Sequence, residues 1–591
     1  MVATKPSGRR FQLVLIKPSH YDDDGYVVQW LRSSIPSNSL AVMYTLAADA
    51  ASRQPLGPDV AIDITAFDET NTRVNVKKLI AQLRRHDDFG MIGLVGVQSN
   101  QFPRALEIAR PFRAAGIPVV MGGFHVSGCL AMLPEMQPDL QAALDLGVTL
   151  FAGEAEGRLE TLLRDVAAGA LAPIYNYLDD LPALEDAPTP FLPRAVIGRT
   201  IKHHASFDAG RGCPFQCSFC TIINVQGRKS RRRSPDDVER LIKQHWAEGV
   251  RRFFITDDNF ARNKDWEAIF DRIIQIRERD KIKVRLIIQV DTLCHKLPNF
   301  VAKAARAGVT RVFIGLENIN PTNLLQAKKR QNRITEYRTM LLDWKRAGVI
   351  TYAGYILGFP ADTPESIRRD IEIIKKELPL DILEFFCLTP LPGSEDHKVL
   401  WQKGAWMDPD MNKYDLEHVV ADHSLMSHAA WHEVYRSAWQ AYYTPEHMTT
   451  ILRRAAASGM GMHRLAAVLF FFSSYPAVEK LHPLQGGIFR LKYRRDRRPT
   501  FPMEPVWAFY PKYWWETASK HVRMAQRWFA IDFMRRRILR DPQHRAYMDQ
   551  ALTAVADDDA ETLDLLTQND AARREVDRAK RIGRPKVAVG V

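Results

Sequence analysis

The sequence predicts an α/β protein in which two arrays of parallel β-strands follow one another and a mainly helical region completes the chain. Short apolar runs of strand length alternate with helical patterns twice along the chain, which is typical of parallel sheets covered by helices. Between the two arrays, residues 171–199 are rich in proline and lack periodicity, as expected of a linker. The 591 residues also exceed the usual size of one hydrophobic core, so several domains are expected.

The first array occupies residues 1–170 and predicts a Rossmann-type, flavodoxin-like sheet. A helical stretch is expected over Ser39–Ala51. The strand candidates are Phe11–Pro18, 59–69, Met91–Val97, Ile117–Gly123 and Leu146–Glu154. In such sheets, ligands bind at the carboxyl ends of the strands. No G-x-G-x-x-G follows the first strand, so a dinucleotide cofactor is not expected.

The second array occupies residues 200–400 and predicts a partial (β/α)6 TIM-like barrel. The strand candidates are 203–210, 251–258, 283–290, 311–317, 351–359 and 382–390. Ser234 and Thr363 each precede a proline and are expected to be helix N-caps. Gly249, Gly308 and Gly348 stand where helices should end. Active residues in this architecture lie at the carboxyl ends of the strands.

Residues 401–591 are expected to form a mainly helical domain that is basic and aromatic. The net charge of the chain is +13, and residues 490–540 hold 14 Lys and Arg against four Asp and Glu. Trp507–Trp515 reads WAFYPKYWW. Three interpretations are open: a helical cap whose aromatic residues are core, a surface for a membrane or lipid substrate, and a nucleic-acid surface. Nucleic acid is the least favoured partner, because no RNA-binding β-barrel is recognisable.

Composition limits the location of the protein. The first ten residues, MVATKPSGRR, lack the apolar run of a secretion signal, and no stretch approaches the roughly 20 apolar residues of a membrane span. Six cysteines are too few for a disulfide framework and fit a reducing compartment. We therefore expect a cytoplasmic protein. If its C-terminal region is a surface for a membrane or lipid substrate, the protein is also expected to bind the membrane peripherally.

Three of the six cysteines, Cys213, Cys217 and Cys220, form a C-x3-C-x2-C motif just after the first barrel strand. Cubane iron–sulfur clusters are usually held by four thiolates, so three would leave one iron open for chemistry. Zinc is the rival interpretation, but a structural zinc site needs a fourth ligand. The nearest candidates are His203 and His204, upstream of the motif.

With Phe219 before its last cysteine, this motif and the array up to about Leu400 resemble the radical S-adenosylmethionine (SAM) superfamily. The resemblance implies a [4Fe–4S] cluster on the three cysteines and SAM bound to the open iron. One electron from an external flavodoxin- or ferredoxin-type donor would then yield a 5′-deoxyadenosyl radical. By the same resemblance, the SAM-binding residues are Phe219, Asp257, Asp258, Asn259, Gln289, Asp291, Glu317 and Gly358.

A flavodoxin-like domain before such a barrel resembles the cobalamin-binding subgroup of the superfamily. The cobalamin-binding residues implied are Gln98, Ser99, Gly122, Gly123, His125, Gly153 and Glu154. Gly123-x-His125-x-x-Gly128 resembles the D-x-H-x-x-G signature of a cobalt-ligating histidine. The aspartate that would orient the imidazole is absent, however, so we expect His125 to be a turn or cavity residue and not a ligand.

The resulting functional hypothesis is cobalamin-dependent methylation of an unactivated carbon in a small molecule, with a lipid or isoprenoid as the expected substrate. One SAM would supply the methyl group and a second the radical. Cyclisation, ring rearrangement or carbon–carbon coupling is the alternative, because it needs the same radical machinery. A metal-stabilised nucleic-acid-binding protein is the distant alternative. The pattern does not identify catalytic residues beyond the cofactor motifs.

Overall fold

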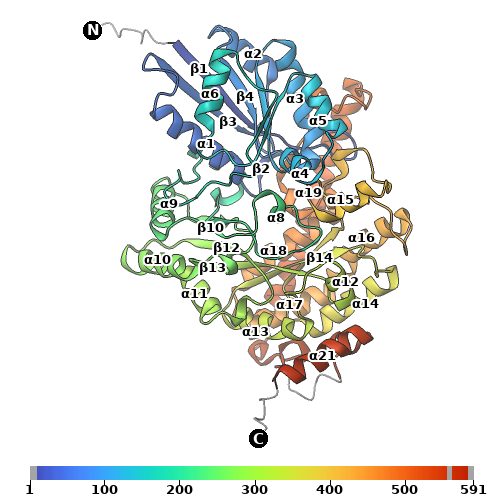
Figure 1. The fold of residues 1–591 in the computed structure, drawn as a ribbon. Coiled ribbons are helices and arrows are strands. Elements are labelled where there is room, and N and C mark those ends of the chain that lie inside the picture. The colour runs from blue at the N-terminus through green and yellow to red at the C-terminus, as the bar shows by residue number, and fades with distance from the viewer. Residues whose placement is uncertain (1–8, 555–561, 584–591) are drawn as a thin grey trace, which may run out of the picture.

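The computed structural model describes residues 9–554 and 562–583 (Figure 1). Residues 1–8, on which most of the expectation about a secretion signal depends, lie outside the described residues. No helix in the described ranges is both long and apolar enough to cross a membrane. The predicted α/β architecture, with two parallel sheets and a helical C-terminal region, is confirmed.

The N-terminal sheet has six strands, all parallel, in the order β3-β1-β4-β5-β6-β7. The strands are β1 (Arg9–Lys17), β3 (Val60–Asp68), β4 (Gly90–Leu94), β5 (Val119–Gly122), β6 (Thr149–Ala152) and β7 (Ile174–Asn176). The last of these corrects the predicted linker, since β7 lies inside residues 171–199 and pairs with β6. A strand of three residues is too short to show an alternating hydrophobic pattern in the sequence. Its backbone hydrogen bonds are made with β6.

Helices cover both faces of this sheet, as its buried strands require. Leu13 and Leu15 of β1 pack in one hydrophobic cluster with α1 and α6, and Val14 and Ile16 pack in another with α2 and α3. The helices are α1 (Asn38–Ser52), α2 (Val76–Arg84), α3 (Phe102–Ala114), α4 (Phe124–Met132), α5 (Pro138–Asp145) and α6 (Leu159–Ala168).

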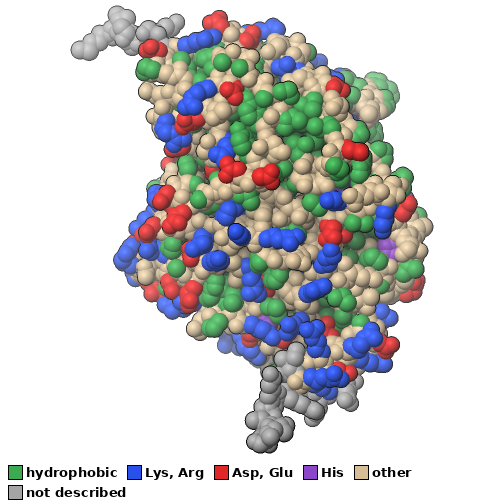
Figure 2. All heavy atoms as spheres, in the orientation of Figure 1, with side chains coloured by type: hydrophobic (Ala, Val, Ile, Leu, Met, Phe, Trp, Pro, Cys, Tyr) green, Lys and Arg blue, Asp and Glu red, His purple; other side chains and the backbone are tan. Residues whose placement is uncertain are grey.

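The second sheet is an open barrel of six parallel strands in the order β15-β14-β13-β12-β11-β8. The strands are β8 (His204–Phe207), β11 (Arg252–Ile255), β12 (Arg285–Val290), β13 (Val309–Glu317), β14 (Ile350–Leu357) and β15 (Ile382–Cys387). The barrel stays open because its edge strands, β8 and β15, do not pair with each other. On the face drawn in Figure 2, basic and acidic side chains are interspersed over this part of the molecule.

The barrel helices begin and end where the sequence predicts. Ser234 and Thr363 cap their helices with side-chain hydrogen bonds, and Gly308 ends α11 in the left-handed conformation, with φ +98°. The longer helices are α9 (Pro235–Ala247), α10 (Trp266–Arg279), α11 (Phe300–Ala307), α13 (Tyr337–Arg346) and α14 (Pro364–Glu377). The short elements are α7 (Arg194–Ile197), α8 (Ile222–Val225), α12 (Pro321–Gln326), β9 (Gly210–Arg211) and β10 (Arg231–Arg232).

The C-terminal region packs against both sheets. Its helices are α15 (Glu395–Gln402), α16 (His428–Tyr442), α17 (Pro445–Ala457), α18 (Met462–Ser474), α19 (Val506–Arg540), α20 (Asp564–Thr567) and α21 (Asp570–Gly583). It also contributes β16 (Gly487–Leu491), which pairs antiparallel with β2 (Gln29–Ser33) in the N-terminal region. The sequence analysis did not predict this pairing, because β2 is only partly apolar and its partner lies in the opposite terminal region of the chain.

Candidate functional site

A cavity of about 640 Å³ lies between the two sheets and the C-terminal region. Lys17, Asp68 and Gln98–Gln101 reach it from strand ends of the N-terminal sheet, and Thr256 and Asp258 reach it from the end of β11. The C-terminal region closes it with Tyr414, Asp415, Leu416, His482, Leu484, Gln485 and Gly486. The carboxyl ends of both sheets therefore open into one space, as ligand sites of both fold types require.

A second cavity, of about 170 Å³, lies over the N-terminal sheet. Its lining is largely apolar and includes Leu13, Leu15, Met91, Val120 and Phe151. The two cavities adjoin, because they share Asn38, Ser39, Gly96, Phe124, Arg211 and Gln226 in their walls. Together they form one site with an apolar and a polar part.

The three motif cysteines lie on the loop between β9 and α8, at the edge of the larger cavity. Cys217 is buried and the other two are half-buried, and Thr221, directly after Cys220, lines the cavity. Burial raises the pKa of Cys213 to about 11 and that of Cys220 to about 12, and the neighbouring Cys217 thiol raises both pKa values further. These raised pKa values keep the free thiols protonated at neutral pH, and a bound metal would favour the thiolate form.

The thiols do not converge on a single point. No group of three or more His, Cys, Asp or Glu side chains among residues 9–554 and 562–583 could hold a metal ion as placed. A cubane differs from a mononuclear site in this respect, because each thiolate binds a different iron. A structural zinc site would need four ligands that converge on one point, and none is found among the described residues.

Lys329 and Gln331 complete the surroundings of the cysteine loop. The Gln331 amide donates a hydrogen bond of 3.4 Å to the Cys217 sulfur. Lys329 is buried and forms an ion pair with Glu317, and although burial opposes its charge, Glu317 and Cys217 raise its pKa. The sequence analysis missed both residues, because the only signal was a lysine some distance after a strand-end glutamate.

The acidic cluster after β11 separates into two roles. Asp257 accepts hydrogen bonds from the backbone N–H groups of Ala209 (2.7 Å) and Gly210 (2.9 Å), so it fixes the approach to the cysteine loop. Asp258, in contrast, lines the larger cavity. Burial raises the pKa of Asp258 to about 7, and the neighbouring Asp257 carboxylate contributes to the rise.

Other predicted SAM-binding residues have protein partners of their own. The Asp291 carboxylate accepts from Arg262 (2.6 and 2.8 Å) and from Asn259 (2.9 Å). The Gln289 amide donates to the Asp257 carbonyl at 3.3 Å. None of these three predicted residues, Asn259, Gln289 and Asp291, lines either cavity in the described structure.

Gly358 has a packing role. Its φ is +102°, and a Cβ atom there would lie 1.9 Å from the Trp431 ring of α16. Phe219 packs edge-on against the adjacent Phe359, with ring centroids 6.1 Å apart. The glycine at position 358 is therefore required by the contact between the barrel and α16, whatever it contributes to a ligand.

The residues predicted to bind cobalamin divide between the two cavities. Gln98 and Ser99 line the larger one, and Gly122, Gly123, Gly153 and Glu154 line the smaller one. His125 lines neither; it is buried at the start of α4, between Ser99 (3.1 Å) and Asp139 (2.6 Å). This placement corrects its inclusion among the ligand-contacting residues, because both ring nitrogens already have protein partners.

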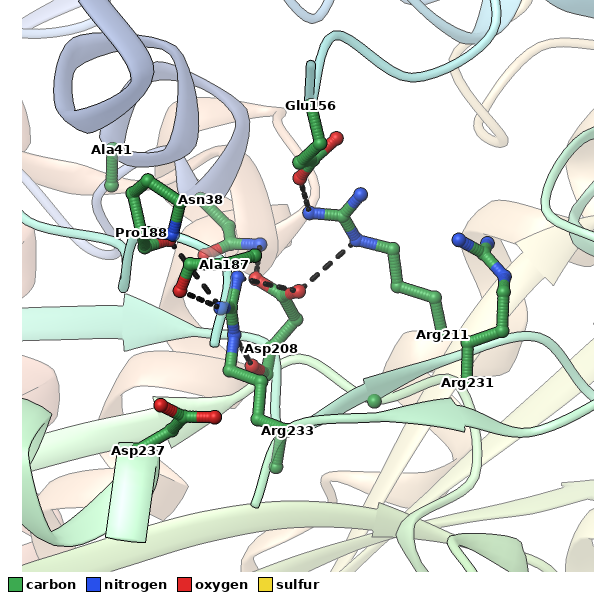
Figure 3. Close-up of polar contacts among 12 residues, drawn as sticks. Asn38, Ala41, Glu156, Ala187, Pro188, Asp208, Arg211, Arg231, Arg233 and Asp237 are labelled. Atoms are coloured by element: carbon green, nitrogen blue, oxygen red, sulfur yellow. Dashed lines mark hydrogen bonds and ion pairs between the residues drawn. The ribbon is translucent and has the colours of Figure 1, made fainter. Parts of the chain in front are cut away.

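A buried ion network joins the N-terminal sheet to the cysteine loop (Figure 3). Arg211, just before Cys213, bonds to Glu154 (2.6 Å), Glu156 (2.7 Å) and Asp208 (3.0 Å). Although burial opposes its charge, the three carboxylates raise the pKa of Arg211 well above its usual value. Arg231 adds a second contact to Glu154, at 2.8 Å. Glu154, predicted from the sequence as a cofactor contact, is thus also part of this interdomain link.

Two buried oxygen atoms in the cavity walls, Asn38 Oδ1 and Glu156 Oε2, have no hydrogen-bond partner among the described residues. Buried polar groups are almost always hydrogen-bonded, so unpartnered ones that border a cavity indicate a polar ligand. Both oxygens accept hydrogen bonds, so the site fits a ligand with polar groups that donate them.

Comparison with known proteins agrees with this geometry. Residues 209–374 match the Radical SAM superfamily model. The chain is 28% identical to bacteriochlorophyllide d C-8(2)-methyltransferase of Chlorobaculum tepidum, covering 56% of this chain and 73% of that protein. It is 24% identical to hopanoid C-2 methylase of Rhodopseudomonas palustris, covering 67% of this chain and 73% of that protein.

Among solved structures, the chain is similar in fold to the radical SAM methyltransferase TsrM from Kitasatospora setae, determined with cobalamin and a [4Fe–4S] cluster. The TM-score is 0.53 at 14% identity, and the match covers 73% of this chain and 89% of TsrM. The cysteine loop at the edge of the cavity, the open parallel barrel and these similarities lead to one assignment. Residues 209–374 form a radical SAM domain, and the chain is a radical SAM enzyme.

Proposed function

We propose that this enzyme transfers a methyl group to an unactivated carbon with the help of cobalamin. The observation that carries the proposal is the shared cavity. One wall holds Thr221 and Asp258 beside the cysteine loop, and the opposite wall holds Gln98 and Ser99 at strand ends of the N-terminal sheet. A radical source and a methyl carrier on these two walls would both reach a substrate between them.

The cofactors would be held by different elements. Cys213, Cys217 and Cys220 would hold the [4Fe–4S] cluster, and the strand ends around Gly122 and Gly153 would hold cobalamin, with Asn38 and Glu156 as polar contacts. When bound, the cluster supplies the electron that cleaves SAM, and cobalamin supplies a carrier for the methyl group. The relatives named as methyltransferases support this choice over other radical reactions.

The residues of the chain position these groups and exclude water. Asp257 holds the backbone before the cysteine motif, and Arg211 ties that backbone to the N-terminal sheet. Lys329 places positive charge beside the thiols. The C-terminal residues Tyr414 and His482 close the cavity on a third side. A closed site of this kind protects a reactive radical from side reactions.

We propose a lipid or isoprenoid substrate drawn from a membrane surface. Apolar side chains from three parts of the chain line the larger cavity, including Trp30, Ile35, Phe254, Phe386 and Leu484. A relative named hopanoid C-2 methylase supports a substrate of this class. We propose that the electron comes from an external flavodoxin- or ferredoxin-type donor.

The first experiment tests the two cofactors. The protein is purified anaerobically, reconstituted with iron, sulfide and hydroxocobalamin, desalted, and examined by ultraviolet–visible spectroscopy. We expect an iron–sulfur shoulder together with retained corrin bands. The C213A/C217A/C220A variant should lose the shoulder and keep the corrin bands, whereas Cys129→Ala, outside the motif, should keep both. Loss of the corrin bands from the unmodified protein would contradict cobalamin binding.

The second experiment tests the reaction. Reduced, reconstituted enzyme is incubated with methyl-labelled SAM and an isoprenoid lipid extract, and the products are quantified by mass spectrometry. Methyl transfer predicts a labelled lipid with 5′-deoxyadenosine and S-adenosylhomocysteine in equal amounts. Deoxyadenosine without the homocysteine product would instead indicate cyclisation, rearrangement or coupling.

A further inference from the structure

Helix α19 is 35 residues long, or about 52 Å, and it has two apolar faces. One face packs against α17 and α18, where Ile531 and Ile538 are buried. Phe509, near the start of the helix, packs against Tyr26 at 5.5 Å between ring centroids. This inner face explains why the helix is attached to the body of the protein, but it accounts for only part of its apolar residues.

The second apolar face is exposed to solvent, and we call it the outer stripe of α19. At about 100° per residue, its members fall within an arc of about 100°, roughly opposite the buried face. Trp507 is 79% exposed, Trp515 is 76% exposed and Phe529 is 68% exposed. The complete outer stripe is Trp507, Trp514, Trp515, Val522, Phe529 and Phe533. The interpretation in which the aromatic residues of the region are core therefore holds for Phe509 but not for the residues of the outer stripe.

The charges around the outer stripe are almost all positive. The helix carries eight Lys and Arg and only two acidic residues. Asp532 is buried and paired with Arg535 and Arg536, and Glu516 lies beside Lys492. No described acidic residue pairs with Arg523, Arg537 or Arg540. The solvent-facing side of α19 therefore combines large aromatic groups with unneutralised cations.

This combination identifies the partner by its chemistry. Exposed patches of this kind mark interaction sites, and Trp with basic residues is the composition of helices that lie in the interface of an anionic bilayer. The stripe runs along one helix, so it presents a line of rings to a flat surface. No described helix is long and apolar enough to span a membrane.

Helix α19 also contacts β16, the strand that follows the cavity-lining residues Leu484, Gln485 and Gly486. Tyr513 Oη donates to the Arg490 carbonyl of β16 at 3.1 Å, and the His521 ring lies 5.2 Å from that of Phe489. Strand β16 pairs with β2, and the adjoining Ile35 and Leu484 line the larger cavity while remaining 37% and 48% exposed. Two exposed apolar side chains therefore lie at the cavity beside the strand pair that α19 contacts.

We propose that α19 docks the enzyme on an anionic membrane surface, with the outer stripe in the headgroup layer. The rings of Trp507, Trp514 and Trp515 supply apolar burial, and Arg523, Arg537 and Arg540 attract anionic lipid. The proposal is independent of the reaction, since it concerns a surface outside the cysteine site.

The test is sedimentation of the full chain with two kinds of vesicle, at low and high salt. One kind is phosphatidylcholine alone, and the other is phosphatidylcholine mixed with phosphatidylglycerol. We expect binding to the anionic vesicles, weakened by salt. The W507S/W514S/W515S variant should bind at least tenfold more weakly. R523Q/R537Q/R540Q should lose affinity for the anionic vesicles by roughly fivefold per arginine removed.

A matched control and a second measurement protect the test against folding defects. Leu325→Ser, at a 65% exposed leucine on α12, should bind like the unmodified protein. Tryptophan fluorescence of the unmodified protein should shift to the blue and be quenched by brominated lipids when vesicles are added. Unchanged fluorescence and no sedimentation would overturn the proposal. It would also be overturned if the tryptophan variant converted a dimer to a monomer without changing vesicle binding, or if RNA competed with the vesicles and alone required the stripe.

Discussion

The interface around Arg211 and the outer stripe of α19 reverse the usual distribution of residues. The first is charged and buried: the Arg211 side chain is 9% exposed and contacts three carboxylates. The second is apolar and exposed, with Trp507 at 79%. Each exception has a physical cost, since buried charges must be desolvated and exposed rings contact water. Each exception is explained by what the region contacts. The buried charges around Arg211 link two domains, and the exposed rings of the outer stripe fit the surface of a partner.

The largest effect is expected from removing the central cation of the buried network. Arg211→Met should lower the free energy of unfolding by about 3–5 kcal/mol, because it leaves the buried Glu156 without a cationic partner and removes one of the two cationic partners of Glu154 and of Asp208. Chemical denaturation of the unliganded protein measures this change. Arg10→Met is the control: its pair with Asp63 is solvent-exposed, and its loss should cost about 0–1 kcal/mol. Equal effects of the two substitutions would show that the network does not hold the domains together.

A smaller effect on the free energy of unfolding is expected at Glu384, a buried carboxyl group that lacks the cationic partners of the Arg211 network. Glu384 of β15 is 1% exposed, its Oε2 has no hydrogen-bond partner among the described residues, and burial raises its pKa to about 8. The folded state therefore holds a proton that the unfolded state releases near pH 4.5, so stability falls as the pH rises from about 4.5 to 8. Glu384→Gln should remove this loss and be about 1–3 kcal/mol more stable at pH 8.

Thermal unfolding between pH 5 and pH 8 measures this difference. The control is Glu365→Gln, because the Glu365 side chain is 79% exposed. If the unmodified protein and Glu384→Gln lose stability in parallel over this range, the raised pKa of Glu384 is wrong.

The smallest effect on folding is expected in the outer stripe. W507S/W515S should change the free energy of unfolding by no more than about 0.5 kcal/mol, because neither ring is packed in the folded protein. Trp431→Ala should instead cost about 3–5 kcal/mol, since that indole is 2% exposed. Calorimetry of both variants tests the contrast. A large loss of stability in W507S/W515S would mean that the stripe is structural.

Much of the fold could be predicted from the sequence, because its strands and helices follow from local residue patterns. All six barrel strands and their capped helices have periodic or punctuated sequences, and the cysteine spacing indicates a metal site by itself. The roles of Asp257 and Asp258 could not be separated in this way, since two adjacent carboxylates look alike until one of them faces backbone N–H groups. The Arg211 network was equally hidden, because Glu154 and Glu156 belong to the other sheet and lie far from Arg211 in the sequence.

The exposure of α19 was not predictable for a related reason. The sequence shows aromatic and basic residues along one helix, but two apolar faces on a helix cancel in any measure of amphipathicity. Only the packing of α17 and α18 against one face reveals that the other is uncovered. The β2–β16 pair was missed because short strands with distant partners leave no local trace.

That same pair has a consequence for the order in which the protein is built. Strand β2 leaves the ribosome early, but its partner β16 follows only after both parallel sheets have been made. At that stage the wall formed by Leu484, Gln485 and Gly486 is still to be synthesised. The C-terminal wall of the chamber between the sheets is therefore made after both of the sheets that it covers.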